Sequence, residues 1–476
     1  MGGPNNIRER DMRKLVIICL VATTALLSSC HIYKAYERPD DLTVSGLYRD
    51  TVSANDTLAS DTANFGNVPW REVFTDPQLQ AYIEEALENN ADLRSAALSV
   101  EQAKASLMSA RLSYLPSFTF SPQGTVTSFN HQKASQAYSI PVNASWQVDL
   151  FAQLLNSHRN AKVTYRQTQY YQQAVQTQII ASVATMYYTL LMLDKQYQIT
   201  EETAGLMKKT VETMEAMYDA AMTNSASVAS SRTSYAQTVA SLTDIKESMR
   251  QTENSFCLLL NKPSQHLERG SFDDQKLPSD FSVGIPLQML SNRPDVKAAE
   301  MSLAACYYNT NSARAAFYPA VTLTGSLGWT NSYGVISNPG HLLATAVASI
   351  TQPLFYRGKL VAALRQAKAA EEQAKLTFQT TLLSAGNDVN NALYQYQMNA
   401  EKAEARTMQV ESAKQAYEDT QELWQLGTST TYLEVISAQA SYLSAQLSQV
   451  ADTYDKLSAV VSLYQALGGG REEIEE

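Results

Sequence analysis

Near the end of the chain, apolar residues recur at alternating intervals of four and three positions. The spacing is unbroken over four repeats, at Ile436, Ala440, Leu443, Leu447, Val450, Tyr454, Leu457, Val461 and Tyr464. A seam with this period predicts a helix that packs lengthwise against other helices. The flanking positions are largely Ala, Ser and Gln, so neighbouring helices can approach closely on more than one side, as in a bundle or a helical tube.

Two other regions alternate between apolar and polar residues with a period of two, which predicts β-strands. In the first region a strand at 138–150 follows a partner at 118–127, and in the second a strand at 321–330 precedes a weaker one at 342–350. The two hairpins supply four strands of about 10 residues, the length of strands in membrane barrels. A half-buried sheet in a soluble protein alternates in the same way, so the pattern by itself leaves both interpretations open.

Proline is absent from two long stretches, between Pro141 and Pro263 and after Pro353. Because proline breaks helix interiors, stretches of this length can hold very long helices. We expect one helix over most of 152–222 and another over 359–426, each about 100 Å long at roughly 1.5 Å per residue. Helices of this length predict a mainly α fold that differs from an ordinary globular domain.

The sequence repeats itself with a nearly constant offset. The matching pairs include 87–93 with 290–296 and Pro116 with Pro319 at an offset of 203, Leu150-Phe151 with Leu354-Phe355 at 204, and Ser234-Tyr235 with Ser441-Tyr442 at 207. An offset that drifts so little indicates two copies of one unit, each with a hairpin followed by long helices.

The duplication, together with an export signal at the start of the chain, predicts the order of segments along the sequence. We assign a signal peptide at 1–29, an N-terminal lipid-anchored segment at 30–71, structural repeat 1 at 72–262, a linker in an equatorial region at 263–285, structural repeat 2 at 286–470 and a C-terminal tail at 471–476. Repeat 1 is expected to hold a hairpin at 113–150 and long helices at 152–260. Repeat 2 is expected to hold a hairpin at 316–356 and long helices at 359–467.

The chain begins with basic residues and a short apolar run, the pattern of an export signal. The apolar run at 15–27 has 13 residues, whereas a membrane-spanning helix needs roughly 20. It ends in Leu27-Ser28-Ser29-Cys30, which resembles the lipobox of bacterial lipoproteins. We therefore predict that 1–29 is removed and that Cys30 carries a diacylglycerol and a fatty acyl chain. The alternative is an ordinary signal peptide in which this cysteine is incidental.

Charge and cysteine content exclude two classes of protein. Removal of 1–29 leaves 33 Lys and Arg against 45 Asp and Glu, so the mature chain is acidic. Nucleic-acid-binding proteins usually carry the opposite charge, and we expect no nucleic-acid partner. Cys257 and Cys306 would be the remaining thiols, which is too few for a disulfide framework, and each lies in a stretch typical of a buried helix.

These patterns together predict an oligomeric membrane protein. The mature sequence has no run of about 18 apolar residues, so a closed barrel is the expected way to cross the bilayer. Four strands cannot close a barrel, because the smallest membrane barrels have about eight. Copies of the chain should therefore share one barrel, and the pattern itself does not fix their number.

Several short motifs follow one another along the second half of the chain. They are Asn292-Arg293-Pro294-Asp295-Val296-Lys297-Ala298-Ala299-Glu300, Ala313-Arg314, Tyr318-Pro319, Leu323-Thr324-Gly325, Gln352-Pro353-Leu354-Phe355 with Gly358, and Tyr432-Leu433-Glu434-Val435 followed by Ala438-Gln439. With these motifs, in this order, the chain resembles the TolC-like outer-membrane efflux factors, in the lipoprotein branch that serves resistance-nodulation-division (RND) pumps (NodT/OprM-like). The resemblance covers nearly the whole mature chain.

The resemblance implies a fold, a function and partners. The fold is mainly α with a membrane β-barrel: a homotrimeric channel, four strands per protomer in a shared barrel of about 12 strands, and a long periplasmic α-helical barrel. The function is a passive exit duct for drugs, toxic compounds or metal ions. The implied partners are a periplasmic adaptor (membrane fusion protein), an inner-membrane RND pump and outer-membrane lipid, and no cofactor is expected.

The resemblance also locates a candidate periplasmic gate near the turn between the two long helices of the second repeat. Glu434 falls where family members often have an acidic gate residue, and Leu433 where pump-linked relatives have an apolar one. Ser437 stands where the family commonly has aspartate, so a gate of paired acid rings is not implied. Gly427 is expected to end the preceding helix in a left-handed conformation. The alternatives are a solvent-exposed charge for Glu434 and ordinary seam packing for Leu433.

An enzyme and a periplasmic adaptor are the alternative classes. The five histidines lack a metal-binding spacing such as H-E-x-x-H, and the sequence has neither a phosphate-binding glycine loop nor a nucleophile elbow, so we predict no catalytic or metal-binding residues. Adaptors are also exported lipoproteins with long helical hairpins, but they need many short strands. Type I secretion, which exports proteins, uses the same fold and is an alternative for the cargo.

Overall fold

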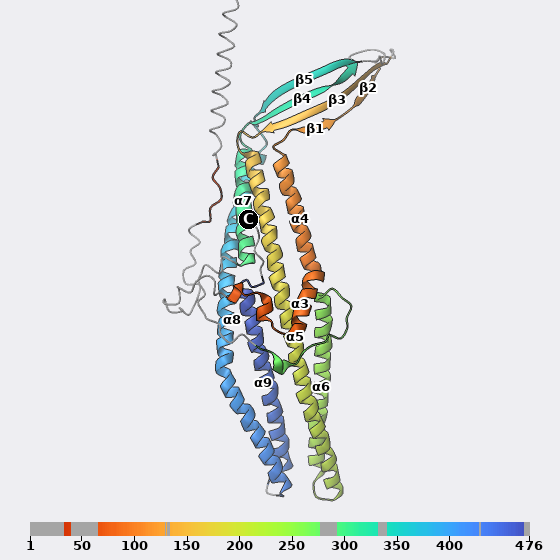
Figure 1. Cartoon of the computed structure of the whole chain (residues 1–476), viewed down its shortest axis with the longest axis vertical. Helices are drawn as coiled ribbons and strands as arrows, with labels where there is room; N and C mark the ends of the chain where they lie inside the picture. Colours follow the sequence, from red (N-terminus) through yellow and green to blue (C-terminus); the bar gives the residue numbers. More distant parts are fainter. Residues whose placement is uncertain are drawn as a thin grey trace, which may run out of the picture. The chain divides into compact units, whose positions relative to one another are not determined.

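The computed structural model describes residues 33–39, 65–128, 130, 134–276, 293–331, 340–427 and 430–470. The predicted signal peptide, Cys30, most of the N-terminal segment, the second part of the linker and the predicted tail lie outside these residues. Figure 1 shows the described elements, which are η2 Phe65–Asn67, α2 Trp70–Val73, α3 Pro77–Asn89, α4 Ala91–Leu112, β1 Ser117–Phe120, β2 Gln123–Thr127, β3 Ser135–Val148, α5 Gln153–Asp219, α6 Ser225–Leu259, η3 Phe272–Asp274, α7 Pro294–Ala315, β4 Ala320–Asn331, β5 His341–Thr351, α8 Lys359–Gln425 and α9 Tyr432–Ala466.

The helices come in pairs of equal length. α5 and α8 have 67 residues each, α6 and α9 have 35, and α4 and α7 have 22. At roughly 1.5 Å per residue, α5 and α8 are each about 100 Å long, as the proline-free stretches predicted. None of the described helices is both long enough and apolar enough to cross a membrane.

The described strands form one antiparallel sheet in the order β1/β2, β3, β4, β5 (Figure 1). β1 and β2 both pair with β3 in one continuous register, since Phe120 pairs with Val142 and Gln123 pairs with Ser139. The predicted strand at 118–127 is therefore present, but it is interrupted. Counted by register, the sheet has the four rows that the alternation predicted.

Two prolines account for the interruption. Pro122 lies in the gap between β1 and β2, and Pro141 lies on β3 where Ser121 donates its N–H to the Pro141 carbonyl (3.3 Å). Because proline has no N–H, neither residue can donate to the ladder at this point. Gly328 pairs with Pro141 from the other side, and a Cβ on this glycine would lie 2.6 Å from the Pro141 Cα. The close approach of β3 and β4 therefore requires glycine.

The chain divides into two compact units, and each unit combines segments from both halves of the sequence. Unit 1 contains the sheet and is formed by 99–169, 298–379 and the N-terminal residues up to 43. Unit 2 is formed by 44–98, 170–297 and 380–476.

In unit 1, residues 33–39 are attached to the helices. The Tyr36 N–H donates to the Tyr308 hydroxyl (3.1 Å), and Arg38 Nε donates to Glu300 Oε1 (2.9 Å). The Arg38 guanidinium also lies over the Phe378 ring, 5.5 Å from its centroid. The chain is therefore fixed to unit 1 within a few residues of Cys30.

The largest core lies in unit 2, where α3 and the preceding short helices pack against α5, α6 and α9. Phe74, Tyr187, Phe256 and Tyr464 are among its fully buried side chains. The Tyr464 ring packs edge-on against Phe74 at a centroid distance of 5.7 Å, and its hydroxyl donates to the Val68 carbonyl (2.8 Å). This core fixes the middle of α5 and the C-terminal parts of α6 and α9.

Candidate functional site

The turn between α8 and α9 contains the candidate gate. α8 ends at Gln425, and Gly427 follows with a φ of +70°, a left-handed conformation that glycine adopts without a steric penalty. The Gly427 N–H donates to the Trp424 carbonyl (3.1 Å) and closes the last turn of the helix. Residues 428–429 of the turn lie outside the described residues.

Glu434 closes the first turn of α9. Its Oε2 accepts the backbone N–H of Thr431, the residue that precedes the helix, at 2.9 Å. This is the glutamate half of a capping box, in which the acid at the third helical position satisfies an N–H that has no partner in the helix. This role was not predicted, although Thr431 followed three residues later by Glu434 is the sequence signature of a capping box.

Leu433 and Ser437 lie on the exposed surface of α9. Leu433 is 65% exposed, which is unusual for leucine, and Ser437 is exposed as well. The neighbouring Tyr432, Val435 and Ile436 are buried. Within one copy of the chain, Leu433 therefore contributes little to packing, which disfavours seam packing as its role.

An apolar cluster near the turn joins the ends of both helical hairpins in unit 2. Met214 of α5 and Val228 of α6 pack with Tyr432, Val435 and Ile436 of α9. The Tyr432 ring contacts the Trp424 ring at a centroid distance of 5.4 Å, and burial raises the pKa of Tyr432 to about 12. Tyr432 is therefore neutral at physiological pH and acts as a packing residue. We refer to these five residues with Trp424 as the tip cluster.

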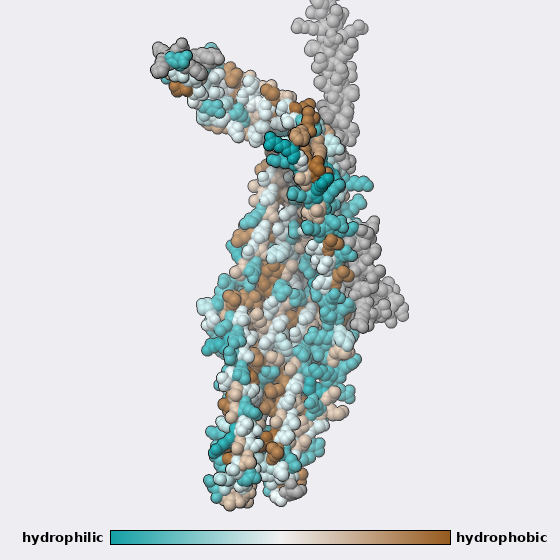
Figure 2. All heavy atoms as spheres, turned by 180° about the vertical axis from the view of Figure 1, so that it is seen from behind, coloured by the Kyte–Doolittle hydropathy of each residue, from teal (hydrophilic) through white to brown (hydrophobic). Residues whose placement is uncertain are grey.

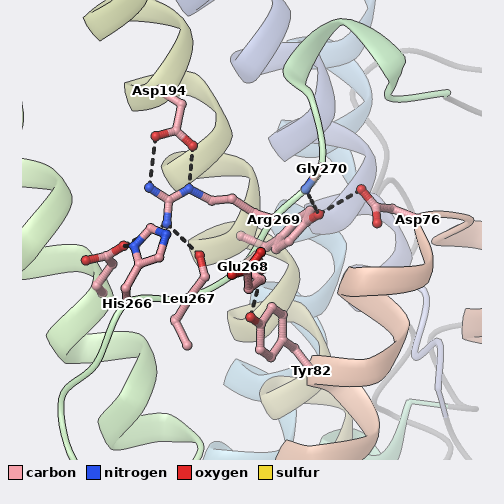
Figure 3. Close-up of polar contacts among 10 residues, drawn as sticks. Asp76, Tyr82, Asp194, His266, Leu267, Glu268, Arg269 and Gly270 are labelled. Atoms are coloured by element: carbon pink, nitrogen blue, oxygen red, sulfur yellow. Dashed lines mark hydrogen bonds and ion pairs between the residues drawn. The ribbon is translucent and has the colours of Figure 1, made fainter.

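A buried ion-pair network lies in the first part of the linker (Figure 3). The Arg269 side chain, 7% exposed, donates from Nη1 to Glu253 Oε1 (2.7 Å) and from Nη2 to Asp194 Oδ1 (2.8 Å). His266 Nδ1 lies 2.8 Å from the same oxygen of Glu253. Because Asp194 belongs to α5 and Glu253 to α6, Arg269 connects the two helices of the first hairpin through the linker.

A second set of hydrogen bonds fixes the next residues of the linker. The Tyr187 hydroxyl donates to Asp76 Oδ2 (2.8 Å) and accepts the Gly270 N–H (3.0 Å), and the Tyr82 hydroxyl donates to the Glu268 carbonyl (2.8 Å; Figure 3). Burial raises the pKa of Tyr187, so this hydroxyl stays protonated and can donate. The linker is thus held by α3 and α5 at several points.

The network predicts acid sensitivity of unit 2. Burial by itself raises the pKa of Glu253, but the hydrogen bonds from Arg269 and His266 outweigh it, so the pKa lies below its ordinary value of 4.5. A carboxylate with a depressed pKa adds stability above that ordinary value, and the stability is lost as the pH falls through the depressed one. We expect the thermal unfolding midpoint, measured by circular dichroism, to drop on acidification below about pH 4.5. Glu253→Gln should flatten this dependence, and an unchanged slope would contradict the assignment.

Arg293, in the motif that begins with Asn292, is also buried. It is 9% exposed, and its Nη2 lies 2.8 Å from Asp295 Oδ2 and 3.1 Å from Asp388 Oδ2. Its Nη1 donates to the carbonyls of Ala385 (3.4 Å) and Ala466 (3.2 Å). One side chain therefore joins the start of α7 to α8 and to the end of α9.

Among the described residues, no group of three or more His, Cys, Asp or Glu is arranged to hold a metal ion. The thiols of Cys257, which is buried, and Cys306, which is half-buried, are both free. The polar clusters of the described chain are thus ion-pair and hydrogen-bond networks.

Long paired helices, a sheet of four rows and a helical turn with an apolar cluster define a channel protomer, and comparison with known proteins gives the family. The family model described as outer membrane efflux protein matches residues 82–262 and 285–469. The chain belongs to this family. The protein is therefore a channel component of an efflux system in the outer membrane, extends into the periplasm and is not an enzyme. The resemblance to TolC-like outer-membrane efflux factors is confirmed.

Similar proteins match nearly the whole chain. The toluene efflux pump outer membrane protein TtgC of Pseudomonas putida is 26% identical over 470 residues, which is 95% of each chain. The cation efflux system protein CusC of Escherichia coli O6:H1 is 27% identical over 465 residues, which is 96% of this chain and 98% of CusC.

Solved structures agree with this assignment. A crystal structure of CusC has a TM-score of 0.82 at 25% identity and covers 93% of this chain and 100% of that one. The open state of the Neisseria gonorrhoeae MtrE outer membrane channel has a TM-score of 0.78 at 25% identity, with 93% and 98% covered. The predicted fold class, mainly α with a small sheet in the manner of outer-membrane channels, is confirmed.

Proposed function

We propose that three copies of this chain form a lipid-anchored exit duct for small molecules. The observation that carries the proposal is the sheet, which has four rows of strands and two edges, β1/β2 and β5, without a described neighbour. Three such sheets would close a barrel of about 12 strands, whereas one is too small to close. The duct would receive its cargo from a periplasmic adaptor and an inner-membrane RND pump.

The cargo is proposed to be drugs, toxic compounds or metal ions. Relatives of similar identity are described as a toluene efflux pump component and as a cation efflux component. Asp and Glu outnumber Lys and Arg in the sequence, with a net charge of −10. An acidic lumen would favour cations modestly, through the local field. The energy for transport would come from the pump.

We also propose that the chain is a duplicated unit with repeat 1 at 72–262 and repeat 2 at 286–470. The equal lengths of α4 and α7, α5 and α8, and α6 and α9 support this division. Residues 263–285 would serve as the linker in the equatorial region, with the signal peptide at 1–29, the lipid-anchored segment at 30–71 and the tail at 471–476.

The gate is proposed to lie at the α8–α9 turn, with Leu433, Glu434 and Ser437 facing the channel entrance. The exposure of all three side chains supports this location, because side chains that face an entrance must be free of packing within their own copy. The tip cluster would keep the two hairpins of each copy together when the entrance is closed.

Two substitutions at Glu434 separate the cap from the gate. Glu434→Ala removes both the charge and the acceptor for the Thr431 N–H, whereas Glu434→Gln removes the charge and keeps an acceptor oxygen. If the charge gates the channel, both variants should raise single-channel conductance in planar bilayers. If only Glu434→Ala raises conductance, capping is the role that matters, and its loss should also cost about 1 kcal/mol of helix stability. Unchanged conductance in both variants would refute the gate assignment.

Lipidation at Cys30 is tested by Cys30→Ser. Without the acyl chains, the protein should lose stable outer-membrane attachment or assemble with a lower yield of oligomers, because covalent lipid adds about 0.8 kcal/mol of membrane affinity per buried CH₂ group. Fractionation of envelopes and metabolic labelling with palmitate measure both effects. Equal anchoring of the variant and the wild-type chain, with no label in either, would refute the lipid assignment.

Conductance of the purified protein is the decisive test of the proposed function. The full-length lipidated chain should migrate as a heat-modifiable oligomer and form channels in planar bilayers. A preparation that yields neither an oligomer nor channel activity would overturn the proposal. Deletion of the gene should sensitise the host to small toxic compounds or metal ions, and a defect confined to protein export would instead favour type I secretion.

A further inference from the structure

Basic side chains gather where the helices of unit 1 adjoin the sheet. Between residues 102 and 169 the chain has six Lys and Arg and one acid, Asp149, and between 301 and 370 it has five Lys and Arg and no Asp or Glu. The chain as a whole has a net charge of −10. In Figure 2, strongly hydrophilic side chains lie beside hydrophobic ones where these helices meet the sheet. A basic cluster in an acidic chain indicates an anionic partner.

Three of these cations surround one histidine of α5. Burial lowers the pKa of His158, and the positive charges of Arg111, Lys162 and Arg159 lower it further. Arg159 is partly occupied, because its Nη1 donates to the Tyr33 carbonyl (3.3 Å). Arg111 and Lys162 are exposed, and neither forms an ion pair within the described part of the chain. Their positive charges are therefore available to an anion from outside the protein.

The duplicated sequence repeats this cluster. The starts of α4 and α7 are 203 residues apart, and the starts of α5 and α8 are 206 residues apart. At these offsets the cations of the first cluster recur as Arg314, Arg365 and Lys368. All three are exposed, and none of them pairs with a carboxylate of a described residue. Each half of the duplicated sequence thus carries the same three charges at the same places on its helices.

The first cluster adjoins the apolar face of the sheet. The Tyr114 ring meets the His158 ring edge-on at a centroid distance of 6.2 Å, and the Trp146 indole N–H donates to the Tyr114 carbonyl (2.9 Å). Trp146 shares one face of β3 with Ile140 and Val142, since residues two apart in a strand face the same side. These three side chains are each exposed, and the exposed apolar face of a membrane barrel contacts lipid. The cations therefore lie beside the edge of the lipid-facing surface.

The helices determine which side of the membrane this edge faces. The protein is an outer-membrane channel that extends into the periplasm, so the ends of the helices at the sheet lie at the periplasmic leaflet. This leaflet consists of phospholipids. A lipid phosphate accepts charge-assisted hydrogen bonds from arginine and attracts lysine as a point charge. The chemistry of the two clusters matches this headgroup.

We propose that the two clusters bind the phosphate headgroups of anionic phospholipids in the periplasmic leaflet. We call them the headgroup sites, with Arg111, Arg159 and Lys162 in the first and Arg314, Arg365 and Lys368 in the second. They depend on the outer-membrane location alone and go beyond the proposed duct, whose number of copies does not affect them. Each Lys or Arg near an anionic lipid surface raises the affinity about fivefold. Bound headgroups hold the junction of sheet and helices at a fixed depth in the membrane.

Native mass spectrometry of the full-length lipidated chain tests the headgroup sites. The protein is freed of bound phospholipid in a neutral detergent and mixed with equal amounts of phosphatidylglycerol and phosphatidylcholine that have the same acyl chains. The wild-type chain should retain more phosphatidylglycerol, because the choline ammonium neutralises the phosphate charge. Arg111→Gln with Lys162→Gln should weaken one site and Arg365→Gln with Lys368→Gln the other, each by at least about tenfold. Each double variant should therefore retain about half of the phosphatidylglycerol that the wild-type chain retains.

A matched pair of lysines controls for net charge. Lys208 and Lys209 are exposed on α5 and belong to unit 2, so Lys208→Gln with Lys209→Gln removes the same charge away from the sheet. This variant should retain the wild-type amount of phosphatidylglycerol. An equal loss in the control, or equal binding of the two lipids to the wild-type chain, would overturn the proposal. Displacement of phosphatidylglycerol by inorganic phosphate at matched ionic strength would identify a free-phosphate site and overturn the choice of a lipid.

Charge-preserving variants and conductance separate the remaining outcomes. Arg111→Lys with Arg365→Lys keeps both charges and should retain most of the phosphatidylglycerol, and a loss as large as that of the glutamine variants would refute an electrostatic site. The substituted side chains are exposed, so all variants should keep the helical circular dichroism and the unfolding midpoint of the wild-type chain. Bound lipid is counted per chain. A wild-type protein without oligomers and conductance would therefore overturn the proposed function, whereas normal conductance without selective lipid binding would overturn the headgroup sites alone.

Discussion

Replacing Arg269 by methionine should lower the free energy of unfolding by about 3 to 5 kcal/mol. Arg269 is 7% exposed and Glu253 is 8% exposed, so the substitution leaves a buried carboxylate without its cation. It also removes the connection from Asp194 of α5 to the linker. The measurement is the unfolding midpoint of the purified protein, followed by helical circular dichroism.

A matched surface pair provides the control for this prediction. Arg232 donates to Glu215 at 2.6 Å, but the two side chains are 64% and 41% exposed. Because solvent screens such pairs, Arg232→Met should change the stability by about 0 to 1 kcal/mol. Equal effects of Arg232→Met and Arg269→Met would show that the buried network contributes no more than a surface ion pair, and would contradict its role in holding the linker.

Arg293→Met should have the second largest effect, about 2 to 4 kcal/mol. The substitution removes the side-chain donor to the Ala385 and Ala466 carbonyls and separates two carboxylates from their shared cation. The cost should be smaller than at Arg269, because Asp295 and Asp388 are 43% and 48% exposed and water can solvate them.

The consequence of losing Arg293 should be local as well as global. Since Arg293 joins the start of α7 to α8 and the end of α9, hydrogen exchange should rise first at the last turn of α9 and at the start of α7. Arg293→Lys keeps the charge but cannot reach both carbonyls and both carboxylates, so it should recover only part of the stability. Full recovery with lysine would show that charge alone is required.

The fold was largely predictable because its elements have strong periodic signals. In α9, apolar residues at intervals of four and three mark the side of the helix that packs on its neighbours. In β3, apolar and polar residues alternate because they lie on opposite faces of the sheet. Both elements lie where these patterns predicted. The break between β1 and β2 was not predicted, because it depends on Pro122 and Pro141 meeting in the register of two strands. Whether a proline interrupts a strand can be predicted only when the residue that pairs with it on the partner strand is known.

The candidate site was less predictable, for a different physical reason. The capping role of Glu434 is local, and the Thr431 signature would have revealed it. The tip cluster joins Met214, Trp424 and Tyr432 from three helices, and no pattern of residues along the chain predicts such a contact. Arg269 likewise lies in a linker without periodicity, and its partners are 16 and 75 residues away. Interactions of this kind are set by tertiary structure.

The two different edges of the sheet have a genetic consequence. An interface that joins β5 of one copy to β1/β2 of another is heterologous, so each subunit must offer both edges for a ring to close. A subunit with a blocked β5 edge could still occupy a place in the ring through its intact β1/β2 edge. If such a variant were expressed together with the wild-type chain and at the same level, each of the three places in the proposed ring would hold either chain with equal chance. About one ring in eight would then contain only wild-type subunits. Mutations at this edge should therefore be dominant negative, whereas mutations that unfold the protomer should be recessive.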